Sequence, residues 1–102
     1  MKLEWTEPAV ETLQGIKDYI AKDNEFYAAR FVGRIVAAAE KLQNFPSLGR
    51  KVPEADREDI REIIFQAYRI IYRSRADRVE ILAVVHGGRD LDGDEIKPWE
   101  VG

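Results

Sequence analysis

The hydrophobic positions in the first half of the chain repeat with the period of an α-helix. Within residues 7–22 they recur every three or four positions, which predicts an amphipathic helix with Thr6 as its N-cap. A second stripe of the same period runs through residues 28–42 and stops before Pro46, because the residue preceding a proline is pushed out of the helical region. The short joint at Asp23-Asn24 makes these helices antiparallel neighbours, an αα-hairpin.

The second half of the chain changes to the pattern of β-strands. A polar loop is predicted over 46–59, and its length favours a functional role. Runs of β-branched and aromatic residues then predict strands at 60–65, 68–73 and 78–86. Their short separators predict an antiparallel meander. With a short strand at 2–5, the expected fold class is α+β, an N-terminal strand and an αα-hairpin packed on a three-stranded antiparallel meander.

Side-chain alternation assigns each residue of the meander to one of two faces. A two-residue turn at Gln66-Ala67 puts Phe65 opposite Tyr68, and a four-residue loop before the last strand puts Tyr72 opposite Val79. The face predicted to pack on the helices carries Ile63, Phe65, Tyr68, Ile70, Tyr72, Val79, Ile81, Ala83 and Val85. The other face carries Ile60, Glu62, Ile64, Arg69, Ile71, Arg73, Arg78, Glu80, Leu82, Val84 and His86. This mixed face is typical of an open binding surface, although a solvated face with scattered aliphatic residues is an alternative.

Composition narrows the classes of site. The 102 residues are 45% hydrophobic, enough for one small core. There is no cysteine and a single histidine, which excludes disulfides, thiolate sites and multi-histidine zinc sites. The acidic run 90–95 has some calcium-loop spacing but lacks the full frame, so no metal and no cofactor is predicted. Without a membrane-length apolar run or a signal-peptide core, a cytoplasmic protein with no membrane partner is expected.

Charge is distributed unevenly along the chain. The net charge is −3, yet residues 60–89 hold six arginines against three acidic residues, and residues 90–102 hold one lysine against five acidic residues. Binding to a polyanion draws on many uncompensated cations. Direct sequence-specific binding to DNA is therefore not expected, whereas a local anion site is compatible with the pattern.

Several short motifs follow one another in a distinctive order. They are Trp5-Thr6 before the first helix, Phe45-Pro-Ser-Leu-Gly-Arg50 after the second, Tyr68-Arg-Ile-Ile-Tyr72 in the central hairpin, and Val85-His-Gly-Gly-Arg-Asp90 after the last strand. Together they resemble the RelE/ParE toxin superfamily over residues 2–91, in the ParE style at the last motif. The expected domains are a toxin domain at 1–91 and an acidic C-terminal tail at 92–102. The resemblance implies the toxin of a type II toxin–antitoxin module, neutralised by a cognate antitoxin protein.

Members of the superfamily act on different targets, so the resemblance leaves more than one possible function. ParE-like members inhibit DNA gyrase, whereas RelE-like members cleave mRNA on the ribosome. A domain that is no toxin and binds a partner through its mixed sheet face is a third possibility. The acidic loop after Lys51 and the glycine that follows His86, where RelE-like toxins place an aromatic residue, favour the ParE-like alternative.

Candidate residues follow from these alternatives. A nuclease needs proton transfer and cations for the phosphate, and His86, Arg69 and Arg73 on one predicted face would supply a minimal set. A protein-binding toxin needs no catalytic residue. Its predicted contacts with target or antitoxin are Arg69, Arg73, Arg78, His86 and Arg89. Arg69 and Arg73 are alternatively cross-strand partners of Glu62 and Glu80, and Arg61 of a loop carboxylate.

Overall fold

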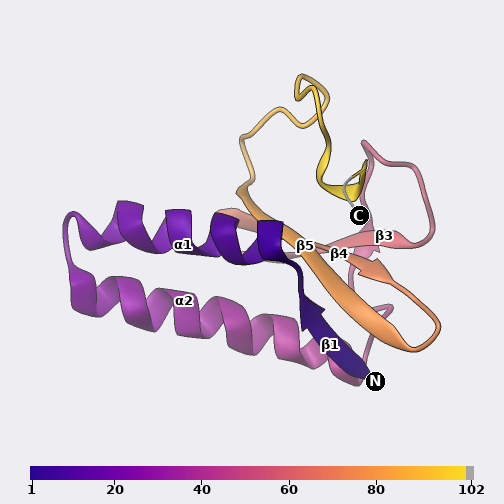
Figure 1. Cartoon of the computed structure of the whole chain (residues 1–102), viewed down its shortest axis with the longest axis horizontal. Coiled ribbons are helices and arrows are strands. Elements are labelled where there is room, and N and C mark those ends of the chain that lie inside the picture. The colour runs from indigo at the N-terminus through magenta and orange to yellow at the C-terminus, as the bar shows by residue number, and fades with distance from the viewer. Residues whose placement is uncertain (101–102) are drawn as a thin grey trace.

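The predicted α+β architecture is confirmed. The computed structural model describes residues 1–100, and Figure 1 shows the αα-hairpin extending away from the sheet. The elements are β1 (Lys2–Trp5), α1 (Glu7–Ala21), α2 (Glu25–Glu40), the 3₁₀ turn η1 (Lys41–Gln43), β2 (Arg50–Lys51), β3 (Ile60–Phe65), β4 (Tyr68–Ser74), β5 (Arg78–His86) and the 3₁₀ turn η2 (Pro98–Glu100). Neither α1 nor α2 is long and apolar enough to cross a membrane.

The sheet has five strands in the order β1-β5-β4-β3-β2. The meander of β3, β4 and β5 is antiparallel, as predicted. Two further strands extend it. β1 pairs with β5 in parallel, with Leu3 beside Val79. The short β2 pairs with β3, so the predicted loop 46–59 is interrupted by a strand that is too short to leave a hydrophobic pattern.

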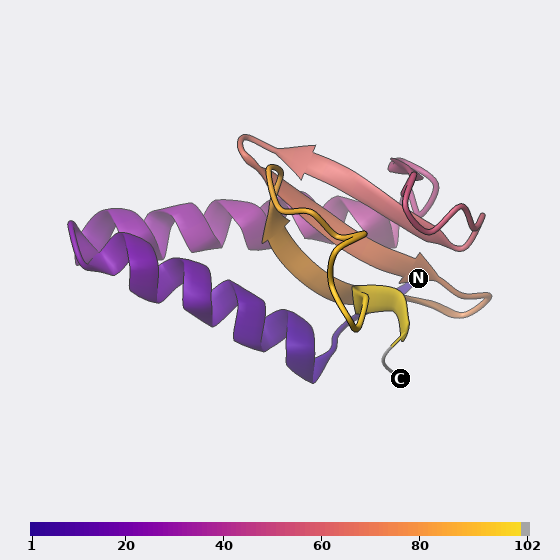
Figure 2. The ribbon, with the colours of Figure 1, turned by 90° about the horizontal axis from the view of Figure 1, so that it is seen from above.

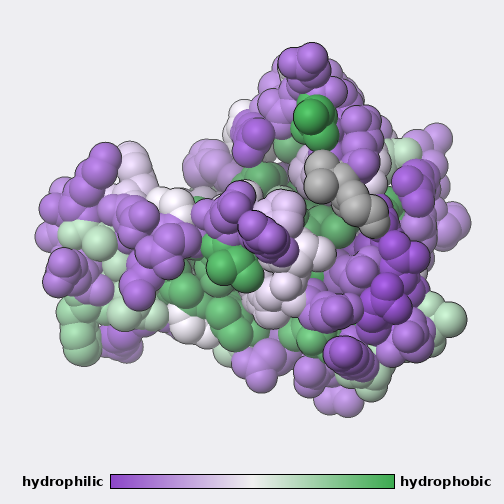
Figure 3. Space-filling model, viewed as in Figure 1, coloured by the Kyte–Doolittle hydropathy of each residue, from purple (hydrophilic) through white to green (hydrophobic). Residues whose placement is uncertain are grey.

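Side-chain caps fix where the two helices begin. The Thr6 hydroxyl accepts a hydrogen bond from the Ala9 amide at 3.3 Å and donates one to the Ile81 carbonyl at 2.7 Å. It therefore starts α1 and joins that start to β5. The Asn24 side chain caps α2 through the Tyr27 amide at 2.9 Å. In Figure 3 hydrophobic residues show between the two helices, whereas hydrophilic residues cover most of this face.

A β-bulge in β5 reverses part of the predicted face assignment. The Gln66-Ala67 turn is confirmed, with Phe65 opposite Tyr68. The register shifts between Ile71, which pairs with Ala83, and Tyr72, which pairs with Ile81. Leu82 is the extra residue, and from it onward the alternation changes sign. The prediction was therefore wrong for four residues. Val84 and His86 lie on the helix side, and Ala83 and Val85 on the other side.

Two hydrophobic cores lie on opposite faces of the sheet. The core under the helices contains Ala9, Phe31, Ile35, Ala39, Leu42, Ile70, Tyr72, Val79, Ile81 and Val84. The second core contains Val52, Ile60, Ile71, Leu82, Ala83, Val85, Leu91 and Trp99. The prediction of an open second face was wrong, because the chain after β5 folds back over it, as Figure 2 shows. The acidic tail is anchored there by the indole of Trp99, which is 7% exposed.

Candidate functional site

Arg69 lies at the centre of a buried network of charges. Its two terminal nitrogens donate to the Glu54 carboxylate at 2.8 and 2.9 Å, and its Nε donates to Glu62 at 2.6 Å. Glu62, which is fully buried, also accepts from Arg50 at 2.7 Å. The hydrogen bond from Arg69 lowers the pKa of Glu54 against the opposing effect of burial. The two carboxylates raise the pKa of the Arg69 guanidinium, Glu54 most strongly. The network ties the loop before β3 to the centre of the sheet.

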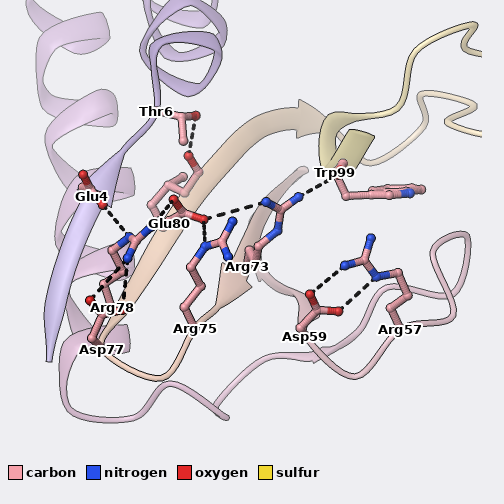
Figure 4. Close-up of polar contacts among 11 residues, drawn as sticks. Glu4, Thr6, Arg57, Asp59, Arg73, Arg75, Asp77, Arg78, Glu80 and Trp99 are labelled. Atoms are coloured by element: carbon pink, nitrogen blue, oxygen red, sulfur yellow. Dashed lines mark hydrogen bonds and ion pairs between the residues drawn. The ribbon is translucent and has the colours of Figure 1, made fainter. Parts of the chain in front are cut away.

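A second network holds Arg73 and Arg78 around Glu80, as Figure 4 shows. Arg73 donates to the Trp99 carbonyl at 2.7 Å and lies 3.9 Å from Glu80. Arg78 lies 2.9 Å from Glu4 on β1 and 3.4 Å from Glu80. Burial raises the pKa of Glu80, but the hydrogen bond from Arg75 and the nearby arginine charges outweigh it, and the pKa lies below its ordinary value. These contacts join β1, β4, β5 and the C-terminal segment.

The structure does not bring the three nuclease candidates together. His86 lies beside Tyr68 on the helix side. The two rings meet edge to face, with their centres 5.6 Å apart. Arg69 and Arg73 project from the opposite face. The prediction of one shared face was therefore wrong, because the bulge at Leu82 turned His86 over. The cross-strand pairing of Arg69 with Glu62 is confirmed, as is the contact of Arg61 with loop residue Glu58 at 3.5 Å.

The residues predicted to contact a partner differ in their exposure and in the carboxylates that they already contact. The side chains of Arg69 and Arg73 are 8% and 9% exposed and already contact carboxylates. Arg89 is half exposed and pairs with Asp94 at 2.9 Å. The predicted contacts of Arg69, Arg73, Arg78, His86 and Arg89 with a partner stay predictions. Of the five, only His86 and Arg89 are exposed residues.

An open apolar groove lies between α2 and β3. Its volume is about 620 Å³. Ala37 and Ala38 of α2 form one wall, and Ile63 and Phe65 of β3, whose side chains lie on the helix side of the sheet, form the other. Leu48, which also lines the groove, is 55% exposed. Exposed aliphatic surface of this kind, gathered in a groove, marks an interaction site.

Cations and an unpaired strand edge border this groove. Arg34, Lys41 and Arg50 line it, and the Arg34 guanidinium lies 5.4 Å from the centre of the Phe65 ring. Among the described residues, β2 pairs only with Arg61 and Glu62 of β3. The outer edge of Ile63–Phe65 thus carries no strand of residues 1–100, so its main-chain groups are available to a partner. The geometry suits an extended or helical peptide with apolar and acidic side chains.

Sequence reasoning missed this groove. It assigned Arg34 and Lys41 no role. Its placement of Ile64 on the mixed face is confirmed, since Ile64 pairs with Arg69. The signal lay in Leu48, an aliphatic residue that neither core includes and that is 55% exposed. Only the packing of β3 beside α2 brings Leu48 into one groove with Ala37 and Phe65.

The fold and sequence were compared with known proteins. A sequence model of the family described as ParE toxin of type II toxin-antitoxin system, parDE, matches residues 3–91. The chain belongs to the ParE toxin family. A Sinorhizobium fredii (strain NBRC 101917 / NGR234) protein named "Putative toxin Y4kP" is 38% identical over 87 residues, covering 83% of this chain and 86% of its own. The ParE assignment rests on these two matches.

A solved structure shares the ParE fold. It is described as "Chromosomal ParDE TA system from P. aeruginosa", and it is 24% identical with a TM-score of 0.72. The similarity covers 84% of this chain and 95% of the other. This likeness supports the fold alone. The family match and the curated relative, by contrast, show that the protein is a ParE-type toxin of a type II toxin–antitoxin system.

Proposed function

We propose that this toxin inhibits DNA gyrase when free, in the cytoplasm, and is neutralised by a cognate antitoxin seated between α2 and β3. The observation that carries the antitoxin proposal is the groove with its unpaired β3 edge. A peptide strand can add to this edge through main-chain hydrogen bonds while its apolar side chains fill the groove. Its carboxylates would meet Arg34 and Lys41, which line the groove.

Membership of the ParE family supports gyrase as the target. The alternative, ribosome-dependent cleavage of mRNA, needs an acid or base beside the cations that hold the phosphate. His86 and the pair Arg69 and Arg73 lie on opposite faces of the sheet, and both arginines already contact carboxylates. This separation supports an inhibitor that acts by binding a protein.

The antitoxin part is tested with the product of a short reading frame next to the toxin gene. We expect the two proteins to co-purify, and Ala37→Glu, at an exposed position of the α2 wall, to weaken their affinity at least about tenfold by placing a charge in the apolar groove. Val10→Glu is the matched control, since Val10 is 51% exposed on α1, outside this groove. Equal losses for both variants, or none for Ala37→Glu, would contradict the proposed location.

The gyrase part is tested with the toxin alone. We expect induced expression to block DNA replication and leave transcripts intact, and purified toxin to inhibit supercoiling by gyrase. Transcripts cut within translated frames, with gyrase activity unchanged, would overturn gyrase as the target and restore the nuclease alternative.

A further inference from the structure

A second apolar groove lies on the other flank of the αα-hairpin, between α1 and the C-terminal end of β5. It encloses about 610 Å³. Three successive turns of α1 form one wall through Thr12, Ile16 and Tyr19. Figure 2 shows the end of β5 beside this helix. The opposite wall and floor are formed by Tyr68, Val84, Val85, His86 and Arg89.

The β-bulge builds the floor of this groove. Because the alternation changes at Leu82, the Val84 side chain and His86 turn toward α1. The Val84 amide donates to the Thr12 hydroxyl at 3.0 Å, so the polar wall residue is engaged with the backbone. A bulge that re-aims side chains beside a hollow is a common feature of functional sites.

The lining of this groove carries basic side chains. They are His86 and Arg89, and a smaller adjoining hollow of about 150 Å³ adds Lys97. Among residues 1–100, no carboxylate lines either hollow, although the whole chain has a net charge of −3. The Arg89 side chain is 51% exposed and forms an ion pair with Asp94 at 2.9 Å. The lining is therefore complementary to an apolar surface that carries carboxylates.

Large hydrophobic residues stand exposed at both ends of these hollows. Tyr19 is 70% exposed at the end toward the hairpin tip, and Ile96 is 64% exposed at the other end. The lining includes both a tyrosine and an arginine, which are residue types that often dominate protein–protein binding.

We propose that the α1–β5 groove is the surface that binds the target protein, through an apolar segment of the target that carries carboxylates. This inference rests on the proposed function as a protein-binding toxin and adds where the target docks. The antitoxin groove is formed by α2 and β3, on the opposite flank. Target and antitoxin thus contact different surfaces, and substitutions can separate toxicity from antitoxin binding.

The test uses the full-length double variant Tyr19→Ala/Arg89→Glu. We expect its inhibition of gyrase supercoiling and its growth arrest to fall at least about tenfold, while its affinity for the antitoxin stays within about twofold. Retained antitoxin binding also shows that the variant is folded. Phe26→Ala is the matched control, because Phe26 is 73% exposed on α2 and has Arg30 5.8 Å from its ring, as Tyr19 has Lys22 at 5.9 Å. This control should inhibit gyrase like the wild type.

The outcomes separate this inference from the proposed function. A double variant that inhibits gyrase and arrests growth like the wild type overturns the α1–β5 groove and leaves gyrase as the target. A wild-type toxin that arrests growth without inhibiting gyrase overturns gyrase as the target. In that case growth arrest becomes the test of the groove. Loss of the arrest in the double variant supports the α1–β5 groove, and an unchanged arrest overturns it. Equal losses in Phe26→Ala and the double variant also overturn it.

Discussion

The Nε of Arg69 lies 2.6 Å from the fully buried carboxylate of Glu62 on the neighbouring strand. Replacing one member of a buried pair is costly because it leaves the other charge without compensation. We therefore expect Arg69→Met to lower the free energy of unfolding by about 3 kcal/mol, measured by urea denaturation. Arg57→Met is the control, since Arg57 and its partner Asp59 are 49% and 39% exposed. It should change stability by less than about 0.5 kcal/mol. A similar small effect for Arg69→Met would contradict the structural role of the pair.

Acid should weaken the fold through the carboxylates that face arginines. The pKa of Glu54 is held below its ordinary value of 4.5 by the hydrogen bond from Arg69. A lowered folded-state pKa gives stability that is present above the unfolded-state pKa and is lost as the pH falls through the folded-state pKa. We expect the free energy of unfolding to decline below about pH 4.5. Glu54→Gln should flatten this decline, whereas Glu7→Gln at the exposed start of α1 should not. Parallel curves for all three proteins would refute the assignment.

Gly49 sits where two strands and a tyrosine leave no room for a side chain. A Cβ at this position would overlap the Glu62 carbonyl and lie 2.8 Å from the Tyr72 hydroxyl. That hydroxyl accepts from the Gly49 amide at 3.0 Å and donates to the Pro46 carbonyl at 2.8 Å. We expect Gly49→Ala to destabilise the protein by roughly 1–3 kcal/mol, as overpacking does. Thermal unfolding measures the effect.

The control is a glycine with open space around it. A Cβ on Gly33, in the middle of α2, meets nothing within 4 Å. Gly33→Ala should stabilise the helix by about 0.5–1 kcal/mol, since alanine restricts the unfolded chain more. If both substitutions shift the melting temperature in the same direction, the close approach at Gly49 does not limit its side chain.

The segment after β5 should contribute to stability through one side chain. Trp99 is buried in the second core, and its carbonyl accepts from Arg73. Trp99→Ala should lower the free energy of unfolding by about 3–5 kcal/mol by opening a cavity. Ile96→Ala, at a 64% exposed position of the same segment, should cost less than about 0.5 kcal/mol. If Trp99→Ala is equally mild, residues 92–102 are a tail outside the domain, as the sequence predicts.

The local structure could be predicted well from the sequence, because each helix and strand shows the hydrophobic period of its own type. Both helices, their short joint and the Gln66-Ala67 turn follow from spacing alone. The bulge at Leu82 could not be seen, since the run from Ile81 to Val85 is apolar throughout and any register buries it. His86 was therefore assigned to the wrong face, and with it the candidate nuclease site.

The remaining differences come from contacts between distant segments. Nothing near Leu3 indicates that β1 pairs with β5, because a parallel partner leaves no turn in the sequence. The second core joins Val52, Leu91 and Trp99, isolated apolar residues in otherwise polar stretches. Both grooves arise in the same way, from side chains that only the packing of helices on the sheet brings together.

The pairing of β1 with β5 also determines when the sheet can be completed during synthesis of the chain. The first strand of the chain, at residues 2–5, finds its partner only in residues 78–81, so a ribosome has made most of the toxin before the sheet can be completed. Pairings over such a separation form late and slowly. Until then Trp5 and the inner face of the αα-hairpin stay exposed. The newly made chain thus passes through a stage with apolar surface that a chaperone, a protease or a waiting partner can bind.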